Sequence, residues 1–245
     1  MSSLNRMLAV LDLFSGDKRA WTAEDMAEKL DYTLATVYRY VRELSEAGLL
    51  RGDSGATFVL GPRIIELDYQ LRVGDPLIGA ARAPMGKLAA ATGCDVVLAT
   101  EYAGHIVTIH HEIGSEPISA SYSRGRRMPL FRGATSLGLV SALPRQRLRK
   151  LHEAEEDTAP DWDELLERIK KIRRDGYAVT VGELDPDLVG IAIPLVSSEH
   201  RVVASLGFIM STARYSLTDV GQSVSMLKNC LGEVLARLGA RAVDA

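Results

Sequence analysis

The sequence predicts an α+β protein, with a small helical unit at the N-terminus and a larger domain in which strands and helices alternate. Two observations carry this prediction. Two short amphipathic segments, residues 22–30 and 34–44, are followed by a turn and an alternating apolar strand at 57–60. From residue 95 onward, strand-like and helix-like segments alternate. An antiparallel sheet with helices packed on it buries the apolar faces of both kinds of segment.

The segments within residues 22–60 follow the order of a winged helix-turn-helix. Thr33 stands where its hydroxyl accepts a backbone N–H at the start of the second helix. Residues 53–55, Asp-Ser-Gly, supply turn chemistry between the two strands of the wing, 49–51 and 57–60. The second helix carries apolar residues at the spacing of one buried stripe, namely Leu34, Val37, Val41 and Leu44.

The opposite face of the second helix suits the DNA major groove, which the second helix of this fold enters. No acidic residue occurs from Tyr32 to Arg42. Small residues near the helix start let the backbone approach the DNA, and the guanidiniums of the helix reach phosphate or guanine. The alternative is that Arg39 and Arg42 belong to an ordinary solvated helix face. The candidate DNA-binding residues are Thr33, Ala35, Thr36, Tyr38, Arg39 and Arg42, with Arg51 on the wing.

The charge balance argues against non-specific binding to nucleic acid. The chain has a net charge of −3, and residues 1–75 alone contain 9 Lys and Arg against 12 Asp and Glu. A non-specific nucleic-acid binder is normally basic. The expectation of sequence-specific DNA binding therefore depends on where the arginines lie. A protein-interaction module that uses the winged helix without DNA stays open as an alternative.

Composition places the chain among ordinary globular proteins of a bacterial cytoplasm. It has 245 residues, of which 47% are apolar and 25% charged. The longest apolar run, 188–196, is too short to span a bilayer, and the two cysteines lie far apart, so neither a membrane partner nor a disulfide framework is expected. Adjacent His110 and His111 on a strand point to opposite faces, so we expect no metal site, and no cofactor.

An enzyme built on the larger domain is the other alternative, and the sequence offers it little support. There is no G-x-S-x-G nucleophile motif, no histidine cluster with metal-ligand spacing and no glycine-rich phosphate loop.

Turn residues divide the chain into three parts. Residues 1–61 form the expected winged helix-turn-helix domain, 62–75 a linker helix that Gly-Asp-Pro at 74–76 ends, and 76–245 the larger domain. Within this larger domain we expect helices at 77–92, 134–143, 144–152, 162–175 and 218–238. We expect strands at 95–100, 105–112, 118–122, 177–181, 188–195 and 202–209.

Several stretches resemble the IclR family of bacterial transcriptional regulators, over nearly all of the chain. They are RMLAVLDLF (6–14), LATVYRYVRELSEAGLL (34–50), GRRMPLFRGAT (125–135), RRDGYA (173–178), GIAIP (190–194) and VASLGF (203–208). The resemblance implies a ligand-responsive regulator, repressor or activator, with a GAF-like effector-binding domain, that forms homodimers and often tetramers. The sequence departs from the family pattern at Phe131, Leu137 and Gly190, where family members line the pocket.

Carried over residue by residue, the resemblance also implies an effector site. Met128 and Ile209 supply its apolar wall, and the helix start at Ala134 favours a carboxylate. We therefore expect a small organic acid, aromatic acids included, because small residues leave volume and arginines lie nearby, at 124, 126, 127 and 132. The alternative is that the residues of this set are ordinary core and turn residues with no role in binding. The full set is Ala120, Met128, Ala134, Thr135, Thr180, Gly190, Gly207 and Ile209.

Overall fold

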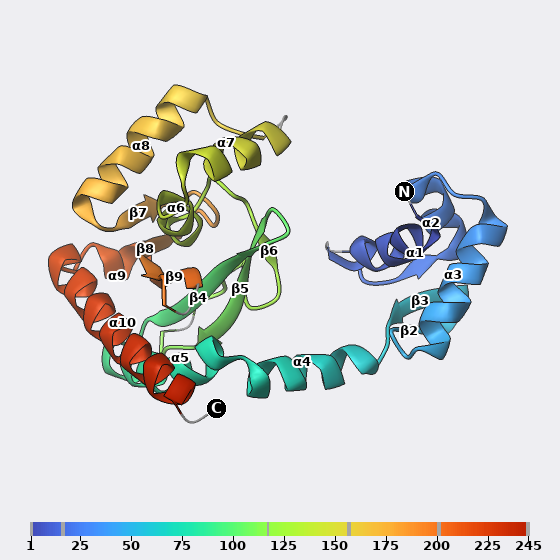
Figure 1. The fold of residues 1–245 in the computed structure, drawn as a ribbon, viewed down its shortest axis with the longest axis horizontal. Coiled ribbons are helices and arrows are strands. Elements are labelled where there is room, and N and C mark those ends of the chain that lie inside the picture. Colours follow the sequence, from blue (N-terminus) through green and yellow to red (C-terminus); the bar gives the residue numbers. More distant parts are fainter. Residues whose placement is uncertain (1, 16–17, 117, 156–157, 200–201, 244–245) are drawn as a thin grey trace. The chain divides into compact units, whose positions relative to one another are not determined.

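The computed structural model describes residues 2–15, 18–116, 118–155, 158–199 and 202–243. The chain divides into two compact units between Asp75 and Pro76. The first unit contains the helix-turn-helix, and the second is an α/β domain, so the α+β fold class is confirmed. Both units are drawn in Figure 1.

The N-terminal unit packs helices against a small antiparallel sheet. Its helices are α1 (Ser3–Asp12), α2 (Ala23–Leu30), α3 (Leu34–Glu46) and α4 (Arg63–Gly74), with 3-10 turns η1 (Leu13–Ser15) and η2 (Ser54–Ala56). Its strands are β1 (Trp21–Thr22), β2 (Leu50–Gly52) and β3 (Thr57–Leu60), in the order β1-β3-β2. The short β1, which the sequence does not predict, pairs with β3 through Trp21 and Thr22. A core that includes Val10, Met26 and Val37 joins the first three helices.

Helix α4 buries none of its side chains within the chain. Its apolar residues are largely exposed, with Ile65 at 73% and Tyr69 at 61%. In α1, Leu4 and Leu8 are exposed as well. Isolated exposed apolar side chains are normal, but a helix with this many is typical of an interaction surface.

The C-terminal unit is built on a six-stranded antiparallel sheet in the order β6-β5-β4-β9-β8-β7. The strands are β4 (Asp95–Tyr102), β5 (His105–Glu112), β6 (Arg127–Met128), β7 (Ala178–Val181), β8 (Leu188–Ser197) and β9 (Val202–Ser211). Strands β4, β9 and β8 occupy the centre and pair along most of their lengths. Their side chains alternate between two buried faces, which explains why the sequence of β8 and β9 is almost continuously apolar.

Helices cover both faces of this sheet, as Figure 1 shows. They are α5 (Pro76–Thr92), α6 (Ala134–Ser141), α7 (Arg145–Ala154), α8 (Trp162–Asp175), α9 (Thr212–Tyr215) and α10 (Val220–Val243). Helices α5 and α10 pack on one face around Met85, Phe208 and Leu227. The second face is covered by α6, with α7 and α8 packed outside it around Leu137 and Ile169.

The strand expected at residues 118–122 is wrong, because this segment is irregular. Its Ser121 N–H donates to the Asp185 side chain at 3.0 Å, so a distant loop takes the donor that a neighbouring strand would need. The strand that does pair with β5 on this side is the two-residue β6, opposite Ile106 and Val107.

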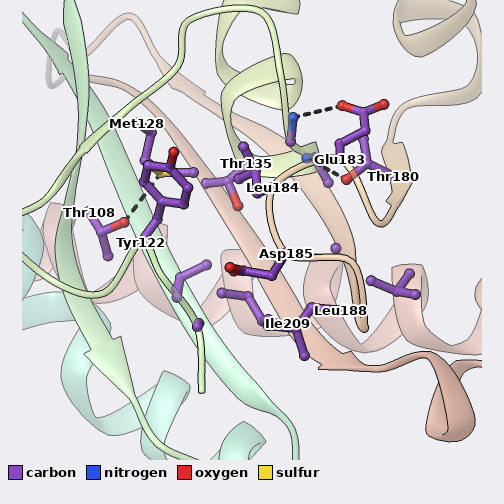
Figure 2. A pocket seen from close by; sticks show the side chains of 16 residues that line it. Thr108, Tyr122, Met128, Thr135, Thr180, Glu183, Leu184, Asp185, Leu188 and Ile209 are labelled. Atoms are coloured by element: carbon purple, nitrogen blue, oxygen red, sulfur yellow. Dashed lines mark hydrogen bonds between the residues drawn. The ribbon is translucent and has the colours of Figure 1, made fainter. Parts of the chain in front are cut away.

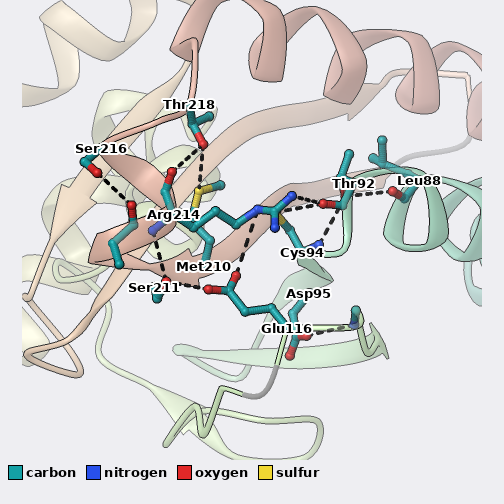
Figure 3. A network of polar contacts seen from close by, with 12 residues as sticks. Leu88, Thr92, Cys94, Asp95, Glu116, Met210, Ser211, Arg214, Ser216 and Thr218 are labelled. Carbon is teal, nitrogen blue, oxygen red and sulfur yellow. Dashed lines mark hydrogen bonds and ion pairs between the residues drawn. The ribbon is translucent and has the colours of Figure 1, made fainter.

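A polar network fixes the segment before residue 117 to the end of the sheet (Figure 3). Arg214 of α9 donates to the Thr92 carbonyl at the end of α5, and its Nε lies 3.9 Å from Glu116 Oε2. Ser211 donates to the other Glu116 oxygen and also caps α9 by accepting the Arg214 N–H at 3.1 Å. These contacts hold the chain that leads toward Ala120.

Candidate functional site

Helix α3 is capped as the sequence predicts. The Thr33 hydroxyl accepts the Thr36 N–H at 3.3 Å, and the two hydroxyls lie 2.8 Å apart. The predicted buried stripe is partly wrong, because Leu34 is 41% exposed and Tyr40 is buried in its place. Leu34 is the first residue of α3, whereas Tyr40 lies in the N-terminal core and is in edge-to-face contact with Tyr32.

The other face of α3 leaves its candidate DNA-binding side chains in solvent. Ala35, Tyr38, Arg39 and Arg42 are exposed, and Thr36 is half-buried. Among the described residues Arg39 has no acidic partner, and its guanidinium lies 5.1 Å from the centre of the Tyr40 ring. Arg42 donates to Glu46 at 2.9 Å, and this carboxylate raises the pKa of Arg42. On this face the Arg39 guanidinium has no carboxylate partner among the described residues. The Arg42 guanidinium must break its ion pair with Glu46 before it can contact DNA.

The wing carries Arg51 on β2, opposite Val59 of β3. Its guanidinium is exposed and lies 3.8 Å from Asp53, a distance that gives an exposed ion pair little stability. The turn between the strands includes Gly55 and Ala56 at positive φ. Arg51 is therefore free to turn toward a phosphate at small cost.

The C-terminal unit contains a cavity on the α6 face of its sheet (Figure 2). It encloses about 50 Å³. Its lining residues come from all six strands of the sheet, from the start of α6, from residues 120–122 and from residues 183–185 between β7 and β8. The lining residues are Val97, Thr108, Ala120, Tyr122, Met128, Gly133, Ala134, Thr135, Thr180, Glu183, Leu184, Asp185, Leu188, Val189, Gly190 and Ile209.

This cavity brings together all the predicted effector residues except Gly207. Gly207 pairs with Ala192 in the sheet and does not line the cavity. Met128 and Ile209 are apolar lining residues, as the family pattern implies. Sequence reasoning missed Thr108, Tyr122 and the residues that cover the cavity. Side chains alternate between the two faces of a strand, and this alternation along β5 is the signal that could have placed Thr108 on a buried face with Ile106.

The small residues do not leave the volume that we expect from the sequence. A Cβ on Gly190 would stand 2.9 Å from Ala134 Cβ, and one on Gly207 would stand 2.8 Å from Ala192 Cβ. These glycines therefore let α6 approach β8 and let β8 approach β9. Their small size serves close packing, so that part of the prediction is wrong.

Side chains of the protein already occupy backbone donors at the start of α6. The Ala134 N–H donates to Thr180 Oγ1 at 2.9 Å, and the Gly133 N–H donates to Glu183 Oε2 at 2.9 Å, as the dashed lines in Figure 2 show. Gly133 has φ +85°, a conformation that favours glycine. The helix start thus binds a carboxylate, as helix N-termini favour, but here the carboxylate is the protein's own.

The segment between β7 and β8, residues 182–187, is named the roof loop here. Two hydrogen bonds close it, from the Gly182 N–H to the Leu188 carbonyl at 2.9 Å and from the Leu188 N–H to the Asp185 carbonyl at 3.0 Å. Asp185 accepts from both the backbone and the hydroxyl of Ser121. The roof loop is therefore attached to the wall that contains Ala120.

The arginines near the cavity bind the protein itself and do not line it, within the part of the chain that is described. Arg124 donates to the Ile109 carbonyl at 2.8 Å, and Arg126 to the Ser121 carbonyl at 2.9 Å. Arg127 lies beside His105, and Arg132 donates to the Glu183 carbonyl. They stabilise the walls and the roof loop.

Two of the histidines on β5, His110 and His111, pair with carboxylates. His110 lies 2.7 Å from Glu112, and His111 lies 2.7 Å from Asp95. Burial lowers the pKa of His110. Across the described ranges, no group of three His, Cys, Asp or Glu side chains is placed to hold a metal ion. No described helix is long and apolar enough to cross a bilayer.

Comparison with known proteins assigns both units to one family. The family model described as the IclR helix-turn-helix domain matches residues 3–54. The model described as the C-terminal domain of IclR bacterial transcriptional regulators matches residues 73–235.

Similar proteins extend over almost the whole chain. The HTH-type transcriptional regulator KipR of Bacillus subtilis is 24% identical over 242 residues, which cover 96% of each chain. The Pca regulon regulatory protein of Pseudomonas putida is 27% identical over 231 residues, 91% of this chain and 78% of that protein. The crystal structure of an IclR homolog from Microbacterium hydrocarbonoxydans, complexed with 4-hydroxybenzoate, matches with a TM-score of 0.79 at 24% identity, covering 98% of this chain and 100% of that one. Since the two family models together span most of the sequence, this chain belongs to the IclR family of bacterial transcriptional regulators.

Proposed function

We propose that this protein is a ligand-responsive regulator that binds its operator sequence-specifically and controls genes for the catabolism of a small organic acid, aromatic acids included. It acts in the bacterial cytoplasm, as repressor or activator. The observation that carries the DNA-binding part is the exposed face of α3, where Thr33 caps the helix and Arg39 and Arg42 project into solvent. A helix of this kind enters the major groove.

In this proposal α3 reads bases and the wing contacts the backbone. The reading residues are those predicted from the sequence: Thr33, Ala35, Thr36, Tyr38, Arg39 and Arg42, with Arg51 on a phosphate. A gel shift with DNA from upstream of the protein's own gene, against scrambled DNA of equal length, tests this. Retardation of the upstream fragment alone supports the proposal, and equal retardation of both fragments refutes sequence-specific binding.

The effector binds in the cavity of the C-terminal unit. Support comes from its apolar lining, from Thr108, Thr135 and Thr180 as hydroxyl partners, and from the carboxylate contact at the start of α6. The names of relatives point the same way, since one regulates the Pca regulon and one fold neighbour was crystallised with 4-hydroxybenzoate. A thermal-shift screen of small organic and aromatic acids, followed by operator binding with each acid that stabilises the protein, tests this part.

The protein acts as a homodimer at least, and a tetramer is the larger assembly proposed. The exposed apolar residues of α4, such as Ile65 and Tyr69, are the surface that a second copy covers. A two-fold dimer requires matched half-sites, so the operator is a near-palindrome.

A further inference from the structure

Glu183 of the roof loop lies at the place on α6 where the carboxylate of an acid effector is proposed to bind (Figure 2). Its Oε2 accepts the Gly133 N–H at 2.9 Å, and its Oε1 accepts from the Arg168 guanidinium of α8. A backbone donor and a guanidinium are the partners that a carboxylate ligand seeks, and such charge-assisted bonds are about twice as strong as neutral ones. The protein therefore fills a carboxylate site with its own carboxylate.

The same loop lines the cavity through Glu183, Leu184 and Asp185. Leu184 lies on Gly133 so closely that a Cβ on that glycine would stand 2.5 Å from Leu184 Cδ1. The enclosed space is about 50 Å³. For comparison, an apolar cavity of about 150 Å³ binds one benzene molecule. A ligand of aromatic size therefore needs more room than this cavity offers, and movement of the roof loop is a way to supply it.

We propose that Glu183 is an internal competitor of the effector and sets its affinity. An acid ligand displaces the Glu183 carboxylate from Gly133, and the roof loop opens as that carboxylate leaves. This inference rests on the proposed function, because it takes the effector to be an acid.

Displacement is required because both carboxylates need the same donor. Gly133 has one N–H, and two carboxylates within hydrogen-bond distance of it repel each other. The Glu183 side chain is 26% exposed and Arg168 is 39% exposed, so Glu183 reaches water without disturbing the core. The measured affinity for an acid is then its intrinsic affinity reduced by the fraction of molecules in which the site is open.

The charge of the ligand separates this mechanism from the alternative. The cavity is lined by two acidic residues, Glu183 and Asp185. If the ligand were an amine, Glu183 would be its partner and removal of its charge would weaken binding. If the ligand is an acid, removal of the same charge strengthens binding.

The test is calorimetry on full-length protein with Glu183→Gln, using benzoate and 4-hydroxybenzoate and the neutral amide of each. Glutamine keeps the shape of the side chain but loses the charge that binds Arg168. We expect the acids to bind Glu183→Gln about tenfold more tightly than wild type. The affinity of the amides should increase less, because an uncharged ligand gains from the more easily opened roof loop but not from the loss of the Glu183 charge. Glu167→Gln is the matched control, since it removes an exposed carboxylate that pairs with Lys170 on the same helix as Arg168.

A second variant, Glu183→Ala, and a second measurement, hydrogen exchange of the roof loop, test the inference independently of Glu183→Gln. Without ligand, peptides covering 182–188 exchange faster in both variants than in wild type, and equal exchange overturns the inference. Acid affinities that are unchanged or weaker in both variants also overturn it, while the proposed function stands. If no acid binds any variant, the effector part of the proposed function fails and the inference fails with it, while the DNA-binding part keeps its own test.

Discussion

Replacing Arg39 by alanine should weaken operator binding more than replacing Arg42. Arg39 has no acidic partner among the described residues, so we expect it to contact DNA without breaking an ion pair. Arg42 must first leave Glu46. That pair is exposed, with side chains at 74% and 60%, and an exposed i,i+4 pair is worth about 0.3–0.5 kcal/mol.

The magnitudes follow from these contacts. A guanidinium on guanine or phosphate contributes about 1–3 kcal/mol, so Arg39→Ala should raise the Kd by roughly 5- to 150-fold. Arg42→Ala should cost about 0.3–0.5 kcal/mol less, which is the energy of the Glu46 pair that wild type gives up. Glu46→Gln should do the opposite and tighten binding about twofold, because it frees Arg42.

The assay is fluorescence anisotropy with labelled operator at one fixed salt concentration, because DNA affinity depends steeply on salt. Arg149→Ala on α7 is the matched control, since it removes an exposed arginine that also pairs at i,i+4, with Glu153 at 2.9 Å, in the other unit. Operator affinity that is unchanged in the Arg39→Ala/Arg42→Ala double variant would falsify the assignment of α3 as the recognition helix.

Four further expectations follow from the structure. Arg51→Ala should weaken operator and scrambled DNA alike and lower the salt slope by about 0.9, and a loss confined to operator contradicts a phosphate role. Ala120→Trp should fill the cavity and abolish the ligand response while leaving operator affinity at the wild-type value; retained response in anisotropy places the effector elsewhere. Ser136→Ala should raise stability by up to about 1 kcal/mol in urea denaturation, because its buried hydroxyl has no partner in the described structure, and a clear loss of stability contradicts this. Sedimentation at micromolar concentration without DNA should show a dimer or larger assembly, and a monomer argues against the role given to α4.

Local patterns explain why the helix-turn-helix could be predicted. Thr33 caps α3 through a contact three residues away, and the turn of the wing lies within residues 53–55. Such interactions are encoded in neighbouring residues. Leu34 shows the limit of this reasoning, because helical spacing places it on the predicted stripe but its side chain is 41% exposed in the structure.

The cavity required knowledge of contacts between distant segments. Glu183 meets Gly133 across 50 residues of sequence, and Ser121 meets Asp185 across 64. No periodicity links these pairs, so the loop that covers the cavity could not be found from the sequence. The glycines were misread for the same reason, since Gly190 is small because Ala134 packs on it from another element.

The most direct test of the whole account is the effect of an acid on operator binding by the full-length protein. Anisotropy of labelled operator should be titrated with an acid found in the thermal-shift screen, in wild type, Glu183→Gln and Ala120→Trp. We expect the acid to shift the operator affinity of wild type by about 5- to 150-fold, to act at lower concentration on Glu183→Gln, and to have no effect on Ala120→Trp. An equal response in all three proteins would show that the cavity does not control DNA binding.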